Sequence, residues 1–167
     1  MPWQDAWPSH QMVESRRKLV ELAELLETHD FGDDTSARSA LSKFVIIRAC
    51  GHLEFTFTEA FCEFTQSQSS PMVANYVRED FKWGINPNRD RLVGRISRLD
   101  KNFSSIFEDF LDQEGTTRSE DLSSLVSLRN LIAHGRNESS ATSQALKLTQ
   151  FSLELSDWLI GTFAPIK

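Results

Sequence analysis

The chain has 167 residues, 40% of them hydrophobic and 25% charged, and it carries a formal net charge of −6 at pH 7. This composition is that of a globular protein and disfavours collagen, disordered chains and disulfide scaffolds, while the length predicts a single domain over residues 1–167. The negative charge argues against a protein that coats nucleic acid electrostatically, although a local basic site is compatible with it.

The two cysteines and the amino terminus predict the compartment. Cys50 and Cys62 fall on one expected helix, where twelve residues span roughly 18 Å, whereas a disulfide needs Cα atoms within about 7 Å. Free thiols, and a start that lacks the pattern of a secretory signal, predict a cytoplasmic protein. No apolar run approaches the roughly 18 residues that span a bilayer, so we expect no membrane insertion.

Hydrophobic residues recur with a helical period along almost the whole chain, and no alternating run is long enough to indicate a strand. The pattern therefore predicts an all-α protein, a bundle of five or six helices. The first helix is expected over residues 10–28, after the capping residue Ser9. A long second helix follows over residues 35–67, and a short third helix over residues 73–83.

The second half of the chain predicts three further helices. The fourth is expected over residues 89–112, with its apolar residues on one broad side. The fifth covers residues 122–134, with Ser119 as its N-cap and Gly135 as its stop. The last begins at Ser140 or Ala141 and ends at residue 163. The phenylalanines of the second and fourth helices are expected in the core. The pattern does not decide whether Trp3 and Trp7 pack on the bundle or meet a partner.

Side chains that can take part in catalysis are concentrated at the end of the fifth expected helix. The sequence has no P-loop, dinucleotide fingerprint, nucleophile elbow or zinc spacing, whereas Arg129, Asn130 and His134 stand interleaved with apolar residues. At about 100° per residue, Asn130 and His134 share nearly one face, and Arg129 is offset from His134 by roughly 140°. Arg129 must therefore reach round the helix or find its partner in another chain.

The residues on the Arg129 side of this helix predict a contact surface. Leu122, Leu125 and Ile132 continue this side, which indicates a contact surface containing a guanidinium. A symmetric dimer through this helix would bring two histidines and two arginines into one cleft.

Residues 129–134 resemble the R-x-x-x-x-H signature of HEPN domains, which are small helical bundles of prokaryotic defence and toxin systems. Asn130 fits this resemblance, since the family favours a polar residue directly after the arginine. Residues 49–54, on the long second helix, resemble the equivalent helix of the RiboL-PSP subgroup. The resemblance covers most of the chain in pattern and is specific over about ten residues.

This resemblance implies a homodimeric endoribonuclease of a toxin or antiviral defence system that needs no metal ion or cofactor. Its partners would be RNA, a second copy of the chain, and an antitoxin or other defence protein. His134 would move a proton at the RNA 2′-hydroxyl or the leaving 5′-oxygen, and Arg129 would stabilise charge on the phosphorane. Asn130 would orient a phosphate or the imidazole, with Glu54 as a supporting residue.

Other interpretations stay open. The motif can serve only dimer structure in a non-catalytic module that binds RNA or protein, and the chain can also be a purely structural adaptor. Arg136 and Arg48 are candidates for RNA contact, with solvated or structural roles as the alternative. Residues 78–101 carry a modest basic excess that could guide RNA or form a solvated face. Toxins controlled by nucleotide transfer often carry tyrosine where this chain has Arg136, and its only tyrosine, Tyr76, is distant, which argues against that regulation.

Overall fold

The structure, a computed structural model, describes residues 7–136 and 141–165. Within these ranges the chain forms seven helices and no strand, so the all-α prediction is confirmed. In chain order the helices are α1 (His10–Thr28), α2 (Thr35–Gln68), α3 (Pro71–Asp80), α4 (Arg89–Leu99), α5 (Lys101–Leu111), α6 (Arg118–Ala133) and α7 (Thr142–Thr162). Trp3 and the alternative helix start at Ser140 lie outside the described residues.

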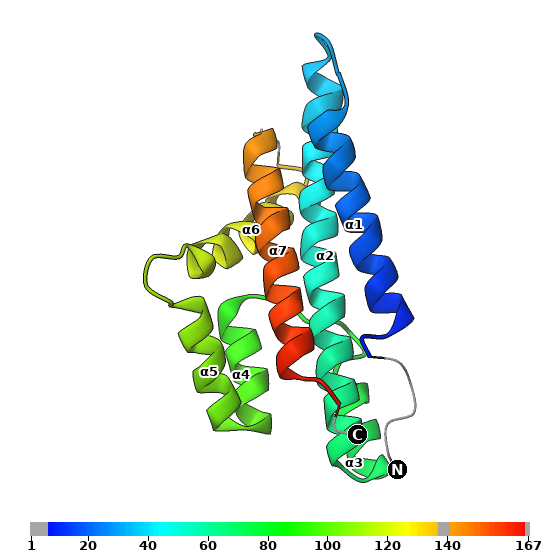
Figure 1. Cartoon of the computed structure of the whole chain (residues 1–167), viewed down its shortest axis with the longest axis vertical. Coiled ribbons are helices and arrows are strands. Elements are labelled where there is room, and N and C mark those ends of the chain that lie inside the picture. Colours follow the sequence, from blue (N-terminus) through cyan, green and yellow to red (C-terminus); the bar gives the residue numbers. More distant parts are fainter. Residues whose placement is uncertain (1–6, 137–140, 166–167) are drawn as a thin grey trace.

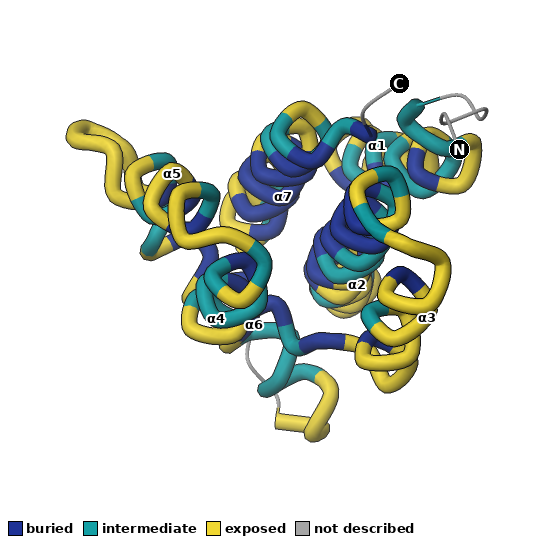
Figure 2. The backbone as a smooth tube through the Cα atoms, turned by 90° about the horizontal axis from the view of Figure 1, so that it is seen from below, coloured by how far each residue is buried: buried dark blue, intermediate teal, exposed yellow. Residues whose placement is uncertain are grey.

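The helix α2 is the centre of the molecule and packs against α1, α3, α6 and α7. Figure 1 shows α1, α2 and α7 running side by side, with α6 crossing them and α4 and α5 forming a hairpin to one side. The buried residues of α2 and α7 face each other at the centre of the bundle (Figure 2). At this contact the Ser152 hydroxyl of α7 donates to the Ala49 carbonyl of α2 at 2.8 Å. Small residues thus bring the two helices close together.

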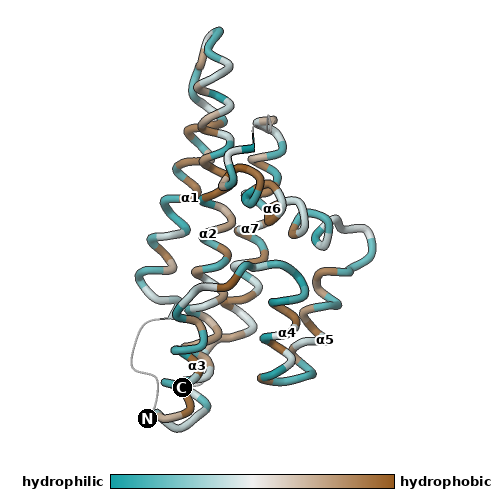
Figure 3. Tube along the Cα trace, turned by 180° about the vertical axis from the view of Figure 1, so that it is seen from behind, coloured by the Kyte–Doolittle hydropathy of each residue, from teal (hydrophilic) through white to brown (hydrophobic). Residues whose placement is uncertain are grey.

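Apolar side chains hold this bundle together, and hydrophobic and hydrophilic residues alternate turn by turn along the helices (Figure 3). One part of the core is a group of aromatic rings with neighbouring centroids 5.3–6.0 Å apart: Phe57, Phe61, Phe64, Phe81, Phe103 and Phe163. Burial of each such ring stabilises the fold by about 1.5–3 kcal/mol before the entropy of ordering is subtracted. Cys50 and Cys62 are buried and unpaired, as their spacing predicts.

The fourth expected helix is wrong as a single element, because the chain turns at Asp100. This residue is extended, with φ −158° and ψ 128°, and its backbone N–H closes α4 by donating to the Ile96 carbonyl at 2.9 Å. Its carboxylate accepts from the N–H groups of Asn102 and Phe103, which caps α5. The hydrophobic period continues across the turn, so only this cap signals the break.

The structure also shows how Trp7 packs and where the third helix begins and ends. Trp7 is partly buried against the core and its indole N–H donates to the Ile160 carbonyl at 3.1 Å. The third helix begins at Pro71, a favoured first position, and ends at Asp80, so Trp83 lies beyond it with its side chain 91% exposed. None of the helices in the described ranges is long and apolar enough to cross a membrane.

Candidate functional site

The first turn of α6 is anchored to α7 by charged side chains. Asp121 is buried and accepts from the Thr117 hydroxyl and from the Lys147 ammonium, both at 2.7 Å. Arg118 pairs with Glu154 of α7 at 2.5 Å. Thr117, rather than the predicted Ser119, is the N-cap residue, and Asp121 stands in the first turn, where a helix favours negative charge. These contacts fix the helix that carries the motif.

The last turn of α6 ends in a Schellman motif. The Gly135 N–H donates to the Ile132 carbonyl and the Arg136 N–H donates to the Leu131 carbonyl, each at 3.0 Å. Gly135 has φ +70°, a conformation that costs other residues about 1–2 kcal/mol. The predicted stop is therefore confirmed. It makes His134 the C-cap residue, with an exposed side chain, and sends the chain away from the helix at Arg136.

Arg129 finds its partners within its own chain. One guanidinium nitrogen, Nη2, donates to Glu54 Oε2 of α2 at 3.3 Å, and the other, Nη1, donates to Asn130 Oδ1 at 3.0 Å. The Arg129 and Glu54 side chains are 28% and 27% exposed, so the pair is partly open to solvent. No hydrogen bond or ion pair joins Arg129 to His134 among the described residues. The guanidinium is thus held by Glu54 and Asn130 and not by the histidine of the motif.

Glu54 is itself held from the other side. Its Oε1 accepts from the Ile85 backbone N–H at 3.0 Å, in the turn that follows α3. Gly84 has φ +73°, which favours glycine, and a Cβ there would lie 2.6 Å from Glu54 Oε1, so a larger residue would displace this carboxylate. The carboxylate therefore joins three segments of the chain, α2, α6 and the turn at Gly84. Sequence reasoning proposed Glu54 as a supporting residue but gave no sign of this turn.

The contact surface predicted on the Arg129 side of α6 is formed with the rest of the same chain. Leu122 and Leu125 are fully buried within the single chain, and Ile132 packs against the same core. Leu122 and Leu125 therefore cannot also meet a second copy. The sequence does not show whether an apolar stripe packs inside its own bundle or against a partner.

Cys50 is a buried thiol of α2 that feels the charge of Arg129. Burial raises the pKa of its thiol, and the nearby Arg129 charge opposes that rise only in part. The thiol is therefore neutral near pH 7, and its role is to pack in the core.

The other face of α6 borders a cavity of about 550 Å³ that sequence reasoning missed. Asn130 lines it, together with Ser123 and Ser127 of the same helix and Asn88 and Arg89 at the start of α4. The signal lies in the spacing, because Ser123, Ser127 and Asn130 follow one another at helical intervals that put them on one side. Polar groups therefore continue along α6 from the motif.

The remaining sequence candidates divide between two places. Arg136 is exposed directly after the motif. Arg48 and His52, by contrast, line a cavity between α1 and α2, with Glu54 not among its lining residues. The structure thus brings Arg129, Asn130 and Glu54 together, leaves His134 and Arg136 at the exposed end of α6, and places Arg48 elsewhere.

Metal ligands do not gather in the described part of the chain, where no group of three or more His, Cys, Asp or Glu side chains could hold an ion. Comparison with known proteins adds one finding. A family model described as RiboL-PSP-HEPN matches residues 12–159, a range that contains Glu54 and all of residues 129–134. No curated protein and no solved structure matches the chain significantly.

Proposed function

The chain belongs to the RiboL-PSP-HEPN family, and from this premise we propose that it is an endoribonuclease with Arg129 and His134 as its catalytic residues. The RNA 2′-hydroxyl attacks the adjacent phosphorus, the bond from phosphorus to the 5′-oxygen breaks, and the products carry a 2′,3′-cyclic phosphate and a 5′-hydroxyl. Because the nucleophile belongs to the substrate, the reaction needs no metal-activated water.

The two residues divide the work by their chemistry. An imidazole can take the proton of the 2′-hydroxyl as a base or give one to the 5′-oxygen as an acid, a contribution of about 10²–10⁴ in rate. A guanidinium has five N–H donors and can stabilise the charge of the phosphorane. Arg129 directs one donor to Glu54 and one to Asn130, which leaves others for a phosphate.

The proposal rests on how Arg129 and His134 are held and how far they are open to solvent. The charged Arg129 is restrained by Glu54 and Asn130 while it keeps solvent access, and the His134 side chain stands exposed at the end of the same helix. A site that acts on a large substrate needs this combination of a fixed electrostatic group and an accessible proton carrier.

A second copy would complete the site. The described part of one chain supplies a single histidine in the motif, whereas the reaction needs a base and an acid on opposite sides of the phosphorus. We propose that the dimer uses the exposed end and the Ser123 side of α6, because the Leu122 side is buried. Two His134 side chains would then divide the base and acid roles.

RNA would reach this site over nearby cations. Arg136 follows the motif, and Arg91 and Arg98 are exposed on α4, with no carboxylate within 4.0 Å in the described ranges. They supply local positive charge on a chain whose net charge is −6. Binding should therefore weaken steeply as salt is raised.

The experiment is cleavage of end-labelled RNA in EDTA by the wild type, Arg129→Ala and His134→Ala. We expect cleavage by the wild type, with cyclic-phosphate ends, and a loss of about 10²–10⁴-fold in either variant. Equal cleavage by His134→Ala, or cleavage only when a divalent metal is added, would overturn the assignment. In a toxin or defence system, expression of the wild type should also arrest growth, and both variants should relieve the arrest. An antitoxin or other partner protein should suppress that arrest when it is expressed with the wild type.

A non-catalytic RNA-binding or protein-binding dimerisation module is the second candidate, favoured by the pairing of Arg129 with Glu54 inside the chain. The substitution Glu54→Gln distinguishes the two functions. If Arg129 acts on phosphate, the amide keeps the shape but holds the guanidinium less firmly, so cleavage falls about tenfold and thermal stability changes little. If the pair is only structural, RNA affinity stays the same, no wild-type cleavage is seen and stability alone changes.

A further inference from the structure

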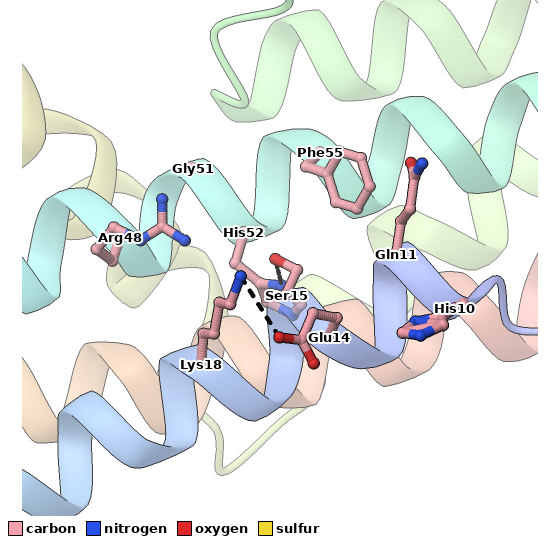
Figure 4. Close-up of a pocket in the computed structure, with 9 residues that line it drawn as sticks. All are labelled: His10, Gln11, Glu14, Ser15, Lys18, Arg48, Gly51, His52 and Phe55. Atoms are coloured by element: carbon pink, nitrogen blue, oxygen red, sulfur yellow. Dashed lines mark hydrogen bonds and ion pairs between the residues drawn. The ribbon is translucent and has the colours of Figure 1, made fainter.

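A groove lies between α1 and α2, away from the motif. It encloses about 780 Å³, within the range of about 300–1,000 Å³ usual for small-molecule sites. Side chains of α1, among them Ser15 and Lys18, line one wall, and side chains of α2, among them Arg48, His52 and Phe55, line the other (Figure 4). The proposed cleavage reaction uses none of these residues.

Positive charge predominates in this groove. Arg48 is exposed and has no carboxylate within 4.0 Å in the described ranges, and Lys18 lies 3.4 Å from Glu14. The Glu14 carboxylate is already paired more closely with Arg17, at 2.7 Å, which lies outside the groove. The groove therefore has spare positive charge for an anion.

A buried polar side chain forms part of the wall. His52 is only 4% exposed, its Nδ1 lies 2.9 Å from the Ser15 hydroxyl, and its Nε2 has no hydrogen-bond partner in the described structure. Burial, and then the charges of Arg16 and Arg48, lower the pKa of His52 to about 4, so the ring is neutral near pH 7. A buried nitrogen without a hydrogen-bond partner lowers the stability of the fold. The fold tolerates this cost and holds Ser15 in a fixed orientation in the wall.

The α2 side of the groove is shaped for a flat group. Figure 4 shows Arg48 and Phe55 on either side of Gly51 along α2. A Cβ at Gly51 would meet nothing within 4 Å, so the floor between them is open. An aromatic face beside an open floor suits the stacking of a nucleobase, and a guanidinium at the other end suits a phosphate.

We propose that the groove between α1 and α2 binds a nucleoside monophosphate unit, with its phosphate at Arg48 and Lys18 and its base on Phe55. The unit can come from a free nucleotide or from one nucleotide of an RNA chain, because both present the same phosphate and base. The site goes beyond the cleavage proposal and does not depend on it.

The test is calorimetric titration of the full chain with AMP, with adenosine, with inorganic phosphate and with a short RNA, all in the His134→Ala background to prevent cleavage. We expect AMP or RNA to bind with a dissociation constant below roughly 1 mM, and adenosine and phosphate alone to bind at least tenfold more weakly. Binding by AMP that RNA does not displace assigns the site to free nucleotides, whereas binding by RNA alone assigns it to an RNA chain.

Two substitutions link binding to the groove. Arg48→Ala should weaken binding about 10–100-fold, and Gly51→Leu should abolish it by filling the floor. Arg38→Ala is the matched control, because Arg38 is an exposed arginine of α2 that lies against Phe31 and outside the groove. Failure of AMP and RNA to bind, or equal affinities in Arg48→Ala and Arg38→Ala, would overturn the proposal. Arg48→Ala is a surface change and keeps the test valid if Gly51→Leu fails to fold.

Discussion

The last turns of α6 and the groove between α1 and α2 each carry an arginine and a histidine, and the two regions hold these side chains in opposite ways. His134 stands at the end of α6 with an exposed side chain, whereas Arg129 on the same helix is bound to Glu54. His52 is buried and bound to Ser15, while Arg48 beside it is exposed and has no carboxylate within 4.0 Å in the described ranges. At the end of α6 the histidine is accessible and the arginine is paired, whereas in the groove the histidine is buried and the arginine is accessible.

This contrast teaches that the same pair of residue types serves different purposes according to burial and partners. A buried neutral imidazole contributes packing and a hydrogen bond, whereas an exposed imidazole can exchange protons with a substrate. A held arginine offers a fixed charge, and an unpaired one offers binding capacity. We therefore expect His134 to affect activity, and His52 to affect stability.

Replacement of each histidine by alanine gives the largest expected effects. His134→Ala should lower RNA cleavage by about 10²–10⁴-fold, equivalent to about 3–5 kcal/mol in the barrier, with little change in the free energy of unfolding. His52→Ala should instead lower the free energy of unfolding by about 2–3 kcal/mol, because it leaves a cavity and an unpartnered Ser15. Urea unfolding and cleavage rates per folded molecule measure the two effects. The contrast fails if His52→Ala reduces cleavage as strongly as His134→Ala.

Acid should destabilise the protein through His52. The pKa of this ring is about 4 in the folded chain, below its ordinary value of 6.5. Between these two values the unfolded chain binds more protons, so the free energy of unfolding falls as the pH is lowered from 6.5 to 4, by about 3 kcal/mol in total.

The measurement is urea unfolding at several pH values for the wild type and for His52→Gln. Carboxylates also titrate in this range, so the difference between the two proteins isolates the contribution of the His52 ring. We expect the wild type to lose about 3 kcal/mol more than the variant over this interval. Parallel pH curves for the two proteins would show that His52 does not carry this dependence.

The sequence predicts the helices better than their packing. The second helix and the Gly135 stop follow from local signals, namely the hydrophobic period, the absence of proline and the C-terminal glycine. The break at Asp100 was missed because the hydrophobic period continues across it and only the capping carboxylate marks it. Local patterns are sufficient where a helix is determined by its own residues.

Contacts between distant segments were outside the reach of the sequence. Arg129 and Glu54 are 75 positions apart, and no periodicity shows that α2 and α6 meet at these residues. The turn at Gly84 that holds Glu54 and the placement of Arg48 on the α1 side of α2 depend equally on the packing. The sequence therefore proposed the candidate residues, and the fold determined which of them lie together.

The two regions also use glycine in opposite ways, which the next two substitutions test. Gly135→Ala should lower the free energy of unfolding by about 1–2 kcal/mol, because φ +70° at this position disfavours a side chain. It should also lower cleavage, since it shifts the end of α6 on which His134 stands. Gly161→Ala is the matched control, because this glycine of α7 has no positive φ and open space at its Cβ. Equal stabilities of Gly135→Ala and Gly161→Ala would contradict the role of the Schellman turn.

Gly51→Ala should have the smallest effect and the opposite sign. Gly51 lies inside α2, where glycine is less favourable than alanine by about 0.5–1 kcal/mol, and a Cβ there meets nothing within 4 Å. The free energy of unfolding should therefore rise by up to about 1 kcal/mol, measured by urea unfolding, while cleavage by His134 is unchanged. Because one methyl group occupies little of the groove, nucleotide binding should survive in Gly51→Ala and be lost in Gly51→Leu. Loss of binding in both would mean that the ligand contacts the α2 backbone itself, and equal binding in both would place the ligand elsewhere.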